Sequence, residues 1–122
     1  MKQRMFGKTN VNVSEISLGC WQLGGRWGDD FDESLARETL DIATSQGINC
    51  FDTADVYQGG MSEHIIGKYI KDMKNPPLVI TKVGRKSNPH IKEAYNKEVL
   101  LNFIIDSKTN MDVESLDMVL LH

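Results

Sequence analysis

The sequence of 122 residues predicts an α/β fold, with a β-hairpin followed by four parallel strands that alternate with three helices. Two observations lead to this prediction. Short apolar segments alternate with stretches of helical periodicity, which is typical of right-handed β-α-β crossovers. The apolar segments are continuous, as in a parallel sheet that is covered on both faces. A doubly wound sheet and part of a (β/α)8 barrel both fit this order, and periodicity does not distinguish them.

The N-terminal segment predicts the hairpin and the first strand. Residues 2–6 and 11–14 flank a turn-like segment at 7–10, and two short runs joined by turn residues are typical of a hairpin. The apolar segment at 16–20 then predicts a short buried strand, which opens into a glycine-rich loop.

The first helix is predicted from its two ends and its apolar stripe. Asp32 is a suitable N-cap, and Gly47 ends the helix as a C′ glycine. Apolar residues at helical spacing lie between these ends, and the segment 48–51 follows as the second strand.

Two further units complete the predicted order. A second helix begins at Ser62 and stops at the segment 75–77, which contains two prolines, and a strand follows at 78–83. A third helix covers roughly 91–108, and residues 116–121 form the fourth strand.

Composition and charge exclude several classes of protein. The net charge of −3 provides no electrostatic basis for binding nucleic acid or an anionic membrane surface. No apolar run approaches the roughly 18–20 residues that span a bilayer. Cys20 and Cys50 lie in apolar segments and form no CxxC pair, so we expect buried free thiols and a cytoplasmic location. The histidines share no ligand spacing with the cysteines, so we expect no metal site.

Polar side chains stand at the ends of three consecutive predicted strands. Asp52, Lys82 and His122 end the second, third and fourth strands, and Tyr57 follows Asp52 by five residues. Neighbouring strand ends in a parallel sheet are about 5 Å apart, so we expect these side chains to lie close together. In an α/β barrel this is the face that carries catalytic residues.

An acid, a phenol, an amine and an imidazole in one place suit proton transfer to a carbonyl oxygen. The pKa of a phenol is near 10, and a neighbouring ammonium lowers it. A carboxylate keeps the ammonium charged, and a neutral imidazole can orient a substrate oxygen. We therefore expect a general acid that protonates a carbonyl oxygen while hydride reaches the carbon, with no need for a metal.

A flavodoxin-like regulator is an alternative, because acidic strand ends also suit a phosphoacceptor or Mg²⁺ site. Such a site needs several converging carboxylates, whereas the strand ends here are an aspartate, a lysine and a histidine.

Four motifs extend along the chain in a fixed order. They are Val13-Ser14-x-Ile16-x-Leu18-Gly19, then Phe51-Asp52-Thr53-Ala54-x-x-Tyr57 with Gly59-Gly60-Met61-Ser62-Glu63 and Gly67, then Val79-Ile80-Thr81-Lys82, and finally Ser115-Leu116-Asp117-x-x-x-Leu121-His122. In this order and spacing they resemble the motifs of the aldo-keto reductases, which are NADPH-dependent (β/α)8-barrel oxidoreductases. The whole chain resembles the first half of such a barrel, from the hairpin to the fourth strand.

The resemblance implies an activity and a set of catalytic residues. The activity is the reduction of a small aldehyde or ketone by NADPH. The resemblance implies Tyr57 as the general acid, Lys82 as the ammonium that favours its phenolate, Asp52 as the partner of Lys82, and His122 as the residue that orients the carbonyl.

The resemblance also implies which residues lie near the nicotinamide ribose, namely Gly19, Cys20, Trp21 and Asp52. A hydroxyl residue is common in the family where Cys20 stands in this chain. Trp21 and Trp27 either line a substrate pocket or cover the mouth of the barrel.

Residues 1–122 are expected to form a single domain that lacks the C-terminal half of the barrel. A complete barrel has about 250 residues and eight strands, and its phosphate site lies in the loops after strands 7–8. No GxGxxG motif replaces that site, so we expect the isolated chain to bind NADPH weakly. The alternative function is a non-catalytic half-barrel, stabilised by a second copy of itself or by a complementary C-terminal half.

Overall fold

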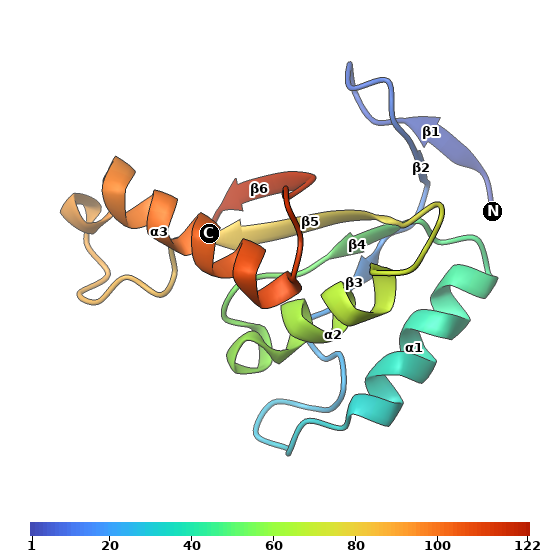
Figure 1. Cartoon of the computed structure of the whole chain (residues 1–122), viewed down its shortest axis with the longest axis horizontal. Coiled ribbons are helices and arrows are strands. Elements are labelled where there is room, and N and C mark those ends of the chain that lie inside the picture. Colours follow the sequence, from blue (N-terminus) through green and yellow to red (C-terminus); the bar gives the residue numbers. More distant parts are fainter.

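The computed structural model describes all of residues 1–122, beginning with the predicted hairpin (Figure 1). Strands β1 (Gln3–Met5) and β2 (Asn12–Ser14) pair antiparallel, with Arg4 opposite Val13. The hairpin lies at the end of the main sheet where its strands begin (Figure 1). There the Asn49 side chain accepts a hydrogen bond from the Ser14 N–H at 2.6 Å, which joins the hairpin to the main sheet.

The main sheet has four parallel strands in the order β3-β4-β5-β6. They are β3 (Leu18–Gly19), β4 (Cys50–Asp52), β5 (Leu78–Val83) and β6 (Met118–Leu121). The spatial order follows the chain order without a reversal. Right-handed crossovers that always step in one direction place every connecting helix on the same face of the sheet. This is the arrangement of a barrel segment, and a doubly wound sheet would need a reversal of strand order.

Helices α1 (Glu33–Ser45) and α2 (Met61–Ile70) lie together on one side of the sheet (Figure 1). The predicted cap of α1 is confirmed, because the Asp32 carboxylate accepts a hydrogen bond from the Leu35 N–H at 3.0 Å. Helix α2 ends at Ile70, five residues before the predicted stop at Asn75. The segment between them forms turns that lead into the proline pair.

The prediction of a helix over 91–108 is wrong at both ends. Helix α3 covers Lys97–Met111, and residues Lys92–Ala94 form a separate 3₁₀ turn, η2. The Asn96 side chain accepts a hydrogen bond from the Val99 N–H at 3.1 Å and so caps α3 several residues later than predicted. At the other end, Asp112 adopts a left-handed conformation with φ of 54° and stops the helix.

The hydrophobic core lies between the helices and the sheet. Its largest fully buried apolar side chains are Phe51, Leu40, Ile65 and Ile66. Burying a side chain of this size stabilises the fold by about 1.5–3 kcal/mol. Cys20 and Cys50 are buried and unpaired, as predicted.

The expectation that both faces of the sheet are covered holds only in part: in β4 the successive residues Cys50 and Phe51 are both buried, but burial is less complete in β5 and β6. Burial alternates along β5, where Val79, Thr81 and Val83 are buried while the residues between them are only partly buried. At the edge strand β6, Leu120 and Leu121 are 43% and 67% exposed. The face that packs against the helices is therefore buried more completely in β5, and the edge strand β6 is exposed at its C-terminal end.

None of the helices combines the length and the apolar character that crossing a membrane requires.

Candidate active site

The structure brings three of the four predicted catalytic residues into direct contact around Lys82. Lys82 lies in β5, and its ammonium donates to Asp52 Oδ1 at 2.5 Å and to the Thr53 carbonyl at 2.9 Å. The same nitrogen lies 3.4 Å from the Tyr57 hydroxyl oxygen. The Lys82 side chain is 17% exposed, and that of Asp52 is 35% exposed. A partly desolvated ammonium is thus held between a carboxylate and a phenol.

Backbone pairing carries Tyr57 to Lys82. Beyond the end of β4, the chain continues alongside β5, because the Thr53 N–H donates to the Ile80 carbonyl and the Asp55 N–H donates to the Lys82 carbonyl. The chain then reverses in the short 3₁₀ segment η1 (Tyr57–Gly60). Positive φ at Gly59 and Gly60 permits this reversal, which keeps Tyr57 above the end of β5.

His122 follows β6 and faces Tyr57 across the site. The two rings are 6.0 Å apart and nearly perpendicular, at 89°. The backbone N–H of His122 donates to the Val83 carbonyl at 2.9 Å. The backbone carbonyl of His122 accepts a hydrogen bond from the Tyr95 hydroxyl at 3.3 Å. Burial lowers the pKa of His122, and the positive charges of Arg85 and Lys82 add to this effect. The imidazole is therefore neutral at neutral pH and suited to hydrogen bonding rather than to ion pairing.

A cavity of about 640 Å³ opens over these residues, within the size range of small-molecule sites. It is lined by Trp21, Trp27, Val56, Tyr57, Arg85 and His122. The two indole rings lie 6.3 Å apart and form one wall. Of the two alternatives for the tryptophans, the geometry favours a position in the pocket.

The four residues predicted near the cofactor differ in how far their side chains are exposed to solvent. Gly19 and Trp21 are exposed, and Asp52 is half-buried. Apart from its neighbours in the chain, no atom lies within 4 Å of the position that a Cβ at Gly19 would occupy. Cys20 is fully buried. Burial raises the pKa of its thiol to about 12, so the group is neutral, and it points to the Leu18 carbonyl at 3.6 Å. The Cys20 side chain is therefore not accessible from the predicted cofactor side.

Ser62 and Glu63 connect the ends of neighbouring strands through side-chain hydrogen bonds, a role that the sequence did not indicate. Ser62 Oγ lies 2.8 Å from Thr53 Oγ1 and donates to the Cys20 carbonyl at 3.1 Å. The buried Glu63 carboxylate accepts from Thr81 Oγ1 at 2.6 Å. A serine and a glutamate at the start of a helix normally suggest solvent-exposed capping. The sequence signals these two residues only through the motif Gly59-Gly60-Met61-Ser62-Glu63, and the buried network appears only in the tertiary structure.

Asp55, two residues before Tyr57, is a fully buried carboxylate. Neither of its side-chain oxygens has a hydrogen-bond partner, and the nearest cation is Lys86 Nζ at 3.8 Å. Burial raises the pKa of Asp55 to about 6, even though Lys86 opposes the rise. The negative charges of Glu63 and Asp106 raise the pKa further. Asp55 therefore costs stability whenever it is ionised.

We expect Asp55→Asn to stabilise the chain at pH 7.5 and to have little effect at pH 4. The folded chain holds the proton more tightly than the unfolded chain, so the wild type loses stability as pH rises from about 3.8 to about 6. At about 1.4 kcal/mol per pH unit, the gain is at most about 3 kcal/mol. Urea unfolding at the two pH values measures it. Asp30→Asn, which changes an exposed carboxylate, is the matched control. Destabilisation by Asp55→Asn at pH 7.5 would show that the contact of Asp55 with Lys86 outweighs the cost of burying its charge.

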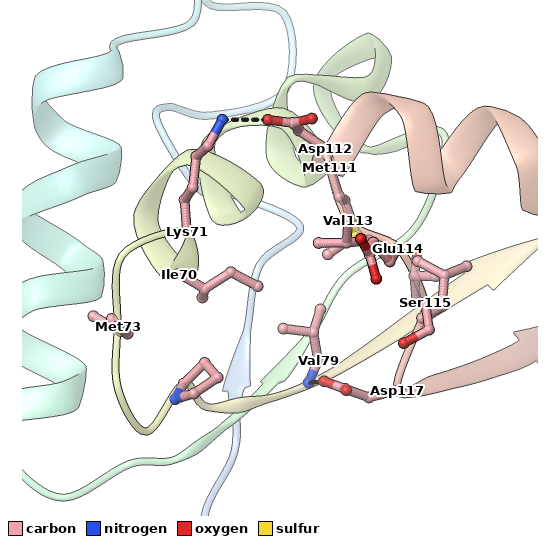
Figure 2. A pocket seen from close by; sticks show the side chains of 13 residues that line it. Ile70, Lys71, Met73, Val79, Met111, Asp112, Val113, Glu114, Ser115 and Asp117 are labelled. Carbon is pink, nitrogen blue, oxygen red and sulfur yellow. Dashed lines mark hydrogen bonds and ion pairs between the residues drawn. The ribbon is translucent and has the colours of Figure 1, made fainter.

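A second cavity, of about 300 Å³, lies near the ends of α2 and α3, away from the proposed site (Figure 2). Several of its polar groups already have partners within the chain. Lys71 forms an ion pair with Asp112 at 2.5 Å, and the Asp117 carboxylate accepts from the Val79 N–H at 2.9 Å (Figure 2). These contacts connect a helix end and two strands.

Comparison with known proteins gives consistent results. The model of the Aldo/keto reductase family matches residues 15–122. The aldo-keto reductase YhdN of Bacillus subtilis is 31% identical over the whole chain, which covers 38% of that protein. The NADH-specific methylglyoxal reductase of Escherichia coli is 37% identical over 69% of the chain and 27% of its own length. The structure of the aldo-keto reductase AKR11C1 from Bacillus halodurans superposes with a TM-score of 0.78 at 32% identity, over 100% of this chain and 40% of that one. The chain thus spans less than half of each relative.

Proposed function

The chain belongs to the aldo/keto reductase family, and on that premise we propose that it carries the proton-transfer residues of a nicotinamide-dependent carbonyl reductase. The substrate is a small aldehyde or ketone, and Tyr57 is the general acid. The proposal includes a cytoplasmic location, which the two buried free cysteines support.

The observation that carries the proposal is the position of Lys82 between Asp52 and Tyr57, at 2.5 Å and 3.4 Å. When the phenol gives its proton to a carbonyl oxygen, negative charge develops on the Tyr57 oxygen. The adjacent ammonium stabilises that charge, and its partial burial strengthens the interaction. Asp52 balances the ammonium when no charge is present on Tyr57.

His122 orients the substrate in this proposal. Its neutral imidazole faces the Tyr57 ring across the cavity, so it can form a hydrogen bond to the same carbonyl oxygen. A bound reduced nicotinamide supplies the hydride that reaches the carbonyl carbon. With the proton from Tyr57, the product is an alcohol.

The open surface of Gly19, Trp21 and Asp52 fits the nicotinamide end of such a cofactor. The exposed indole of Trp21 offers a flat face, and Gly19 leaves room for close approach. The Asp52 carboxylate can accept a hydrogen bond from a ribose hydroxyl. We propose NADPH as the cofactor. Because the E. coli relative is an NADH-specific enzyme, activity is tested with both NADPH and NADH.

We expect NADPH and reduced nicotinamide mononucleotide to bind residues 1–122 with similar affinity, within about twofold, at Kd values of about 1 mM or weaker. The reason is that the chain offers groups for the nicotinamide end and no glycine-rich phosphate loop. Energy transfer from tryptophan to the reduced nicotinamide measures both. Much tighter binding of NADPH would place an adenosine-phosphate site within this chain.

Activity is tested in an assembled barrel. Residues 1–122 are mixed with, or fused to, the remaining C-terminal segment of the B. subtilis relative, and methylglyoxal reduction is followed with NADPH and with NADH. Carbonyl-dependent oxidation of either cofactor supports the proposal. An assembly that binds cofactor and reduces none of a panel of aldehydes and ketones would contradict it.

The second candidate function is a non-catalytic half-barrel that associates with a second copy or with a complementary half. The open edge of β6 and the exposed Leu120 and Leu121 favour it, because an unpaired apolar edge promotes strand pairing between chains. Light scattering distinguishes a monomer of 13.8 kDa from larger assemblies. Association without any cofactor binding would support this candidate over the first.

A further inference from the structure

Arg85 and Lys86 are adjacent in the sequence, but the structure gives them different surroundings. Lys86 lies 3.8 Å from the buried Asp55 carboxylate. Arg85 lines the cavity with Tyr57 and His122. The pair therefore does not act as a single solvated patch, which is the ordinary interpretation of two adjacent basic residues.

The Arg85 guanidinium is available to a ligand. Its side chain is exposed, it forms no ion pair with any carboxylate of the chain, and none of its nitrogens takes part in a side-chain hydrogen bond. It also lines a neighbouring hollow of about 410 Å³ with His90 and His122. A guanidinium binds carboxylates and phosphates through two parallel hydrogen bonds.

We propose that Arg85 forms an anion subsite, so that the substrate of this site is a carbonyl compound that also carries a carboxylate. The inference rests on the proposed function, since Tyr57 and His122, which would hold the carbonyl, line the same cavity as Arg85. The two tryptophans line this cavity as well, which suits an apolar linker between the carbonyl and the carboxylate.

The charges around the cavity favour a carboxylate over a phosphate. Arg85 contributes one positive charge, and Lys82 is already paired with Asp52 at 2.5 Å. His122 is neutral at neutral pH, since burial and the nearby cations lower its pKa. One unpaired cation balances a carboxylate of charge −1, whereas a phosphate monoester of charge near −2 would leave excess negative charge close to Asp52.

The test uses the chain as it is and its own fluorescence. The sequence contains two tryptophans, and both line the cavity, so a change in tryptophan emission reports on this site. The probes are 4-oxopentanoate, its uncharged methyl ester, and dihydroxyacetone phosphate. The variants are Arg85→Gln, the conservative Arg85→Lys, and Lys86→Gln as the matched control at the adjacent cation.

We expect 4-oxopentanoate to bind about fivefold more tightly than its ester at low ionic strength, and the preference to shrink at 0.5 M salt. Arg85→Gln should remove the preference and leave ester binding unchanged, Arg85→Lys should keep part of it, and Lys86→Gln should keep all of it.

Equal binding of acid and ester by the wild type would overturn the subsite and leave the carbonyl site in place. Loss of the preference in Lys86→Gln alone would overturn the assignment of the subsite to Arg85. Tighter binding of dihydroxyacetone phosphate than of 4-oxopentanoate would overturn the assignment of the ligand as a carboxylate. Failure of acid and ester alike to bind would count against the carbonyl site as well.

Discussion

Tyr57→Phe is expected to lower the rate of carbonyl reduction by about 10²–10⁴-fold in an assembled barrel that contains residues 1–122, because it removes the proposed proton donor. The ring stays in place, so its contact with His122 and its position over Lys82 are kept. Only the hydroxyl that lies 3.4 Å from the Lys82 ammonium is lost. Single-turnover rates with saturating cofactor measure the change.

The matched control is Tyr69→Phe, the same chemical change at a buried ring outside the site. Tyr69 packs in the core and its hydroxyl lies 2.8 Å from Thr44 Oγ1, so this variant should lose some stability and keep its turnover rate. Cofactor binding should be unchanged in both variants. A Tyr57→Phe assembly that retained full activity would show that another group donates the proton.

Gly67→Ala is expected to destabilise the chain by about 3 kcal/mol, although alanine is the better helix former. A side-chain carbon at Gly67 would lie 2.0 Å from the Met111 carbonyl oxygen, so α2 and the end of α3 would have to move apart. Helix propensity alone predicts the opposite sign, a gain of about 1 kcal/mol. The sign of the change in unfolding free energy in urea therefore decides between close packing and propensity.

Gly19→Ala is the control for this experiment. No atom lies within 4 Å of the added carbon, and its φ is not in the left-handed region, so its effect on stability should stay within about 0.5 kcal/mol. Stabilisation by Gly67→Ala would mean that α2 and α3 do not pack as closely as the structure has them.

Elements with local signals were predictable. Helix α1 begins after Asp32 and ends before Gly47, because an aspartate that bonds a backbone N–H and a glycine with positive φ act on their own neighbours. Helix α3 was placed too early, because Ile91 and the residues after it continue a weak apolar pattern, while the Asn96 side chain supplies the cap. Where several start signals compete, the spacing of apolar residues does not choose among them.

The proximity of the candidate site residues could be predicted from the sequence, but the orientation of individual side chains could not. Asp52 and Lys82 lie at the ends of their strands and His122 follows β6. Parallel strands bring their ends together, so the proximity of these residues could be expected from chain order. The roles proposed for them and for Tyr57 stay predictions. The different surroundings of Arg85 and Lys86 depend on which way successive side chains point beyond the end of β5, and no sequence pattern specifies that.

The sequence by itself determined the α/β class, the alternation of strands and helices, and the family motifs, since these depend on short-range periodicity and on the identity of individual residues. Tertiary structure alone decided that the strands run in unbroken order with the helices on one face, that Glu63 and Asp55 are buried carboxylates, and that Arg85 lines the cavity. The physical reason is the same in each case. Burial and electrostatic environment depend on segments that are distant in the chain, so they are set only when the sheet and its helices pack together.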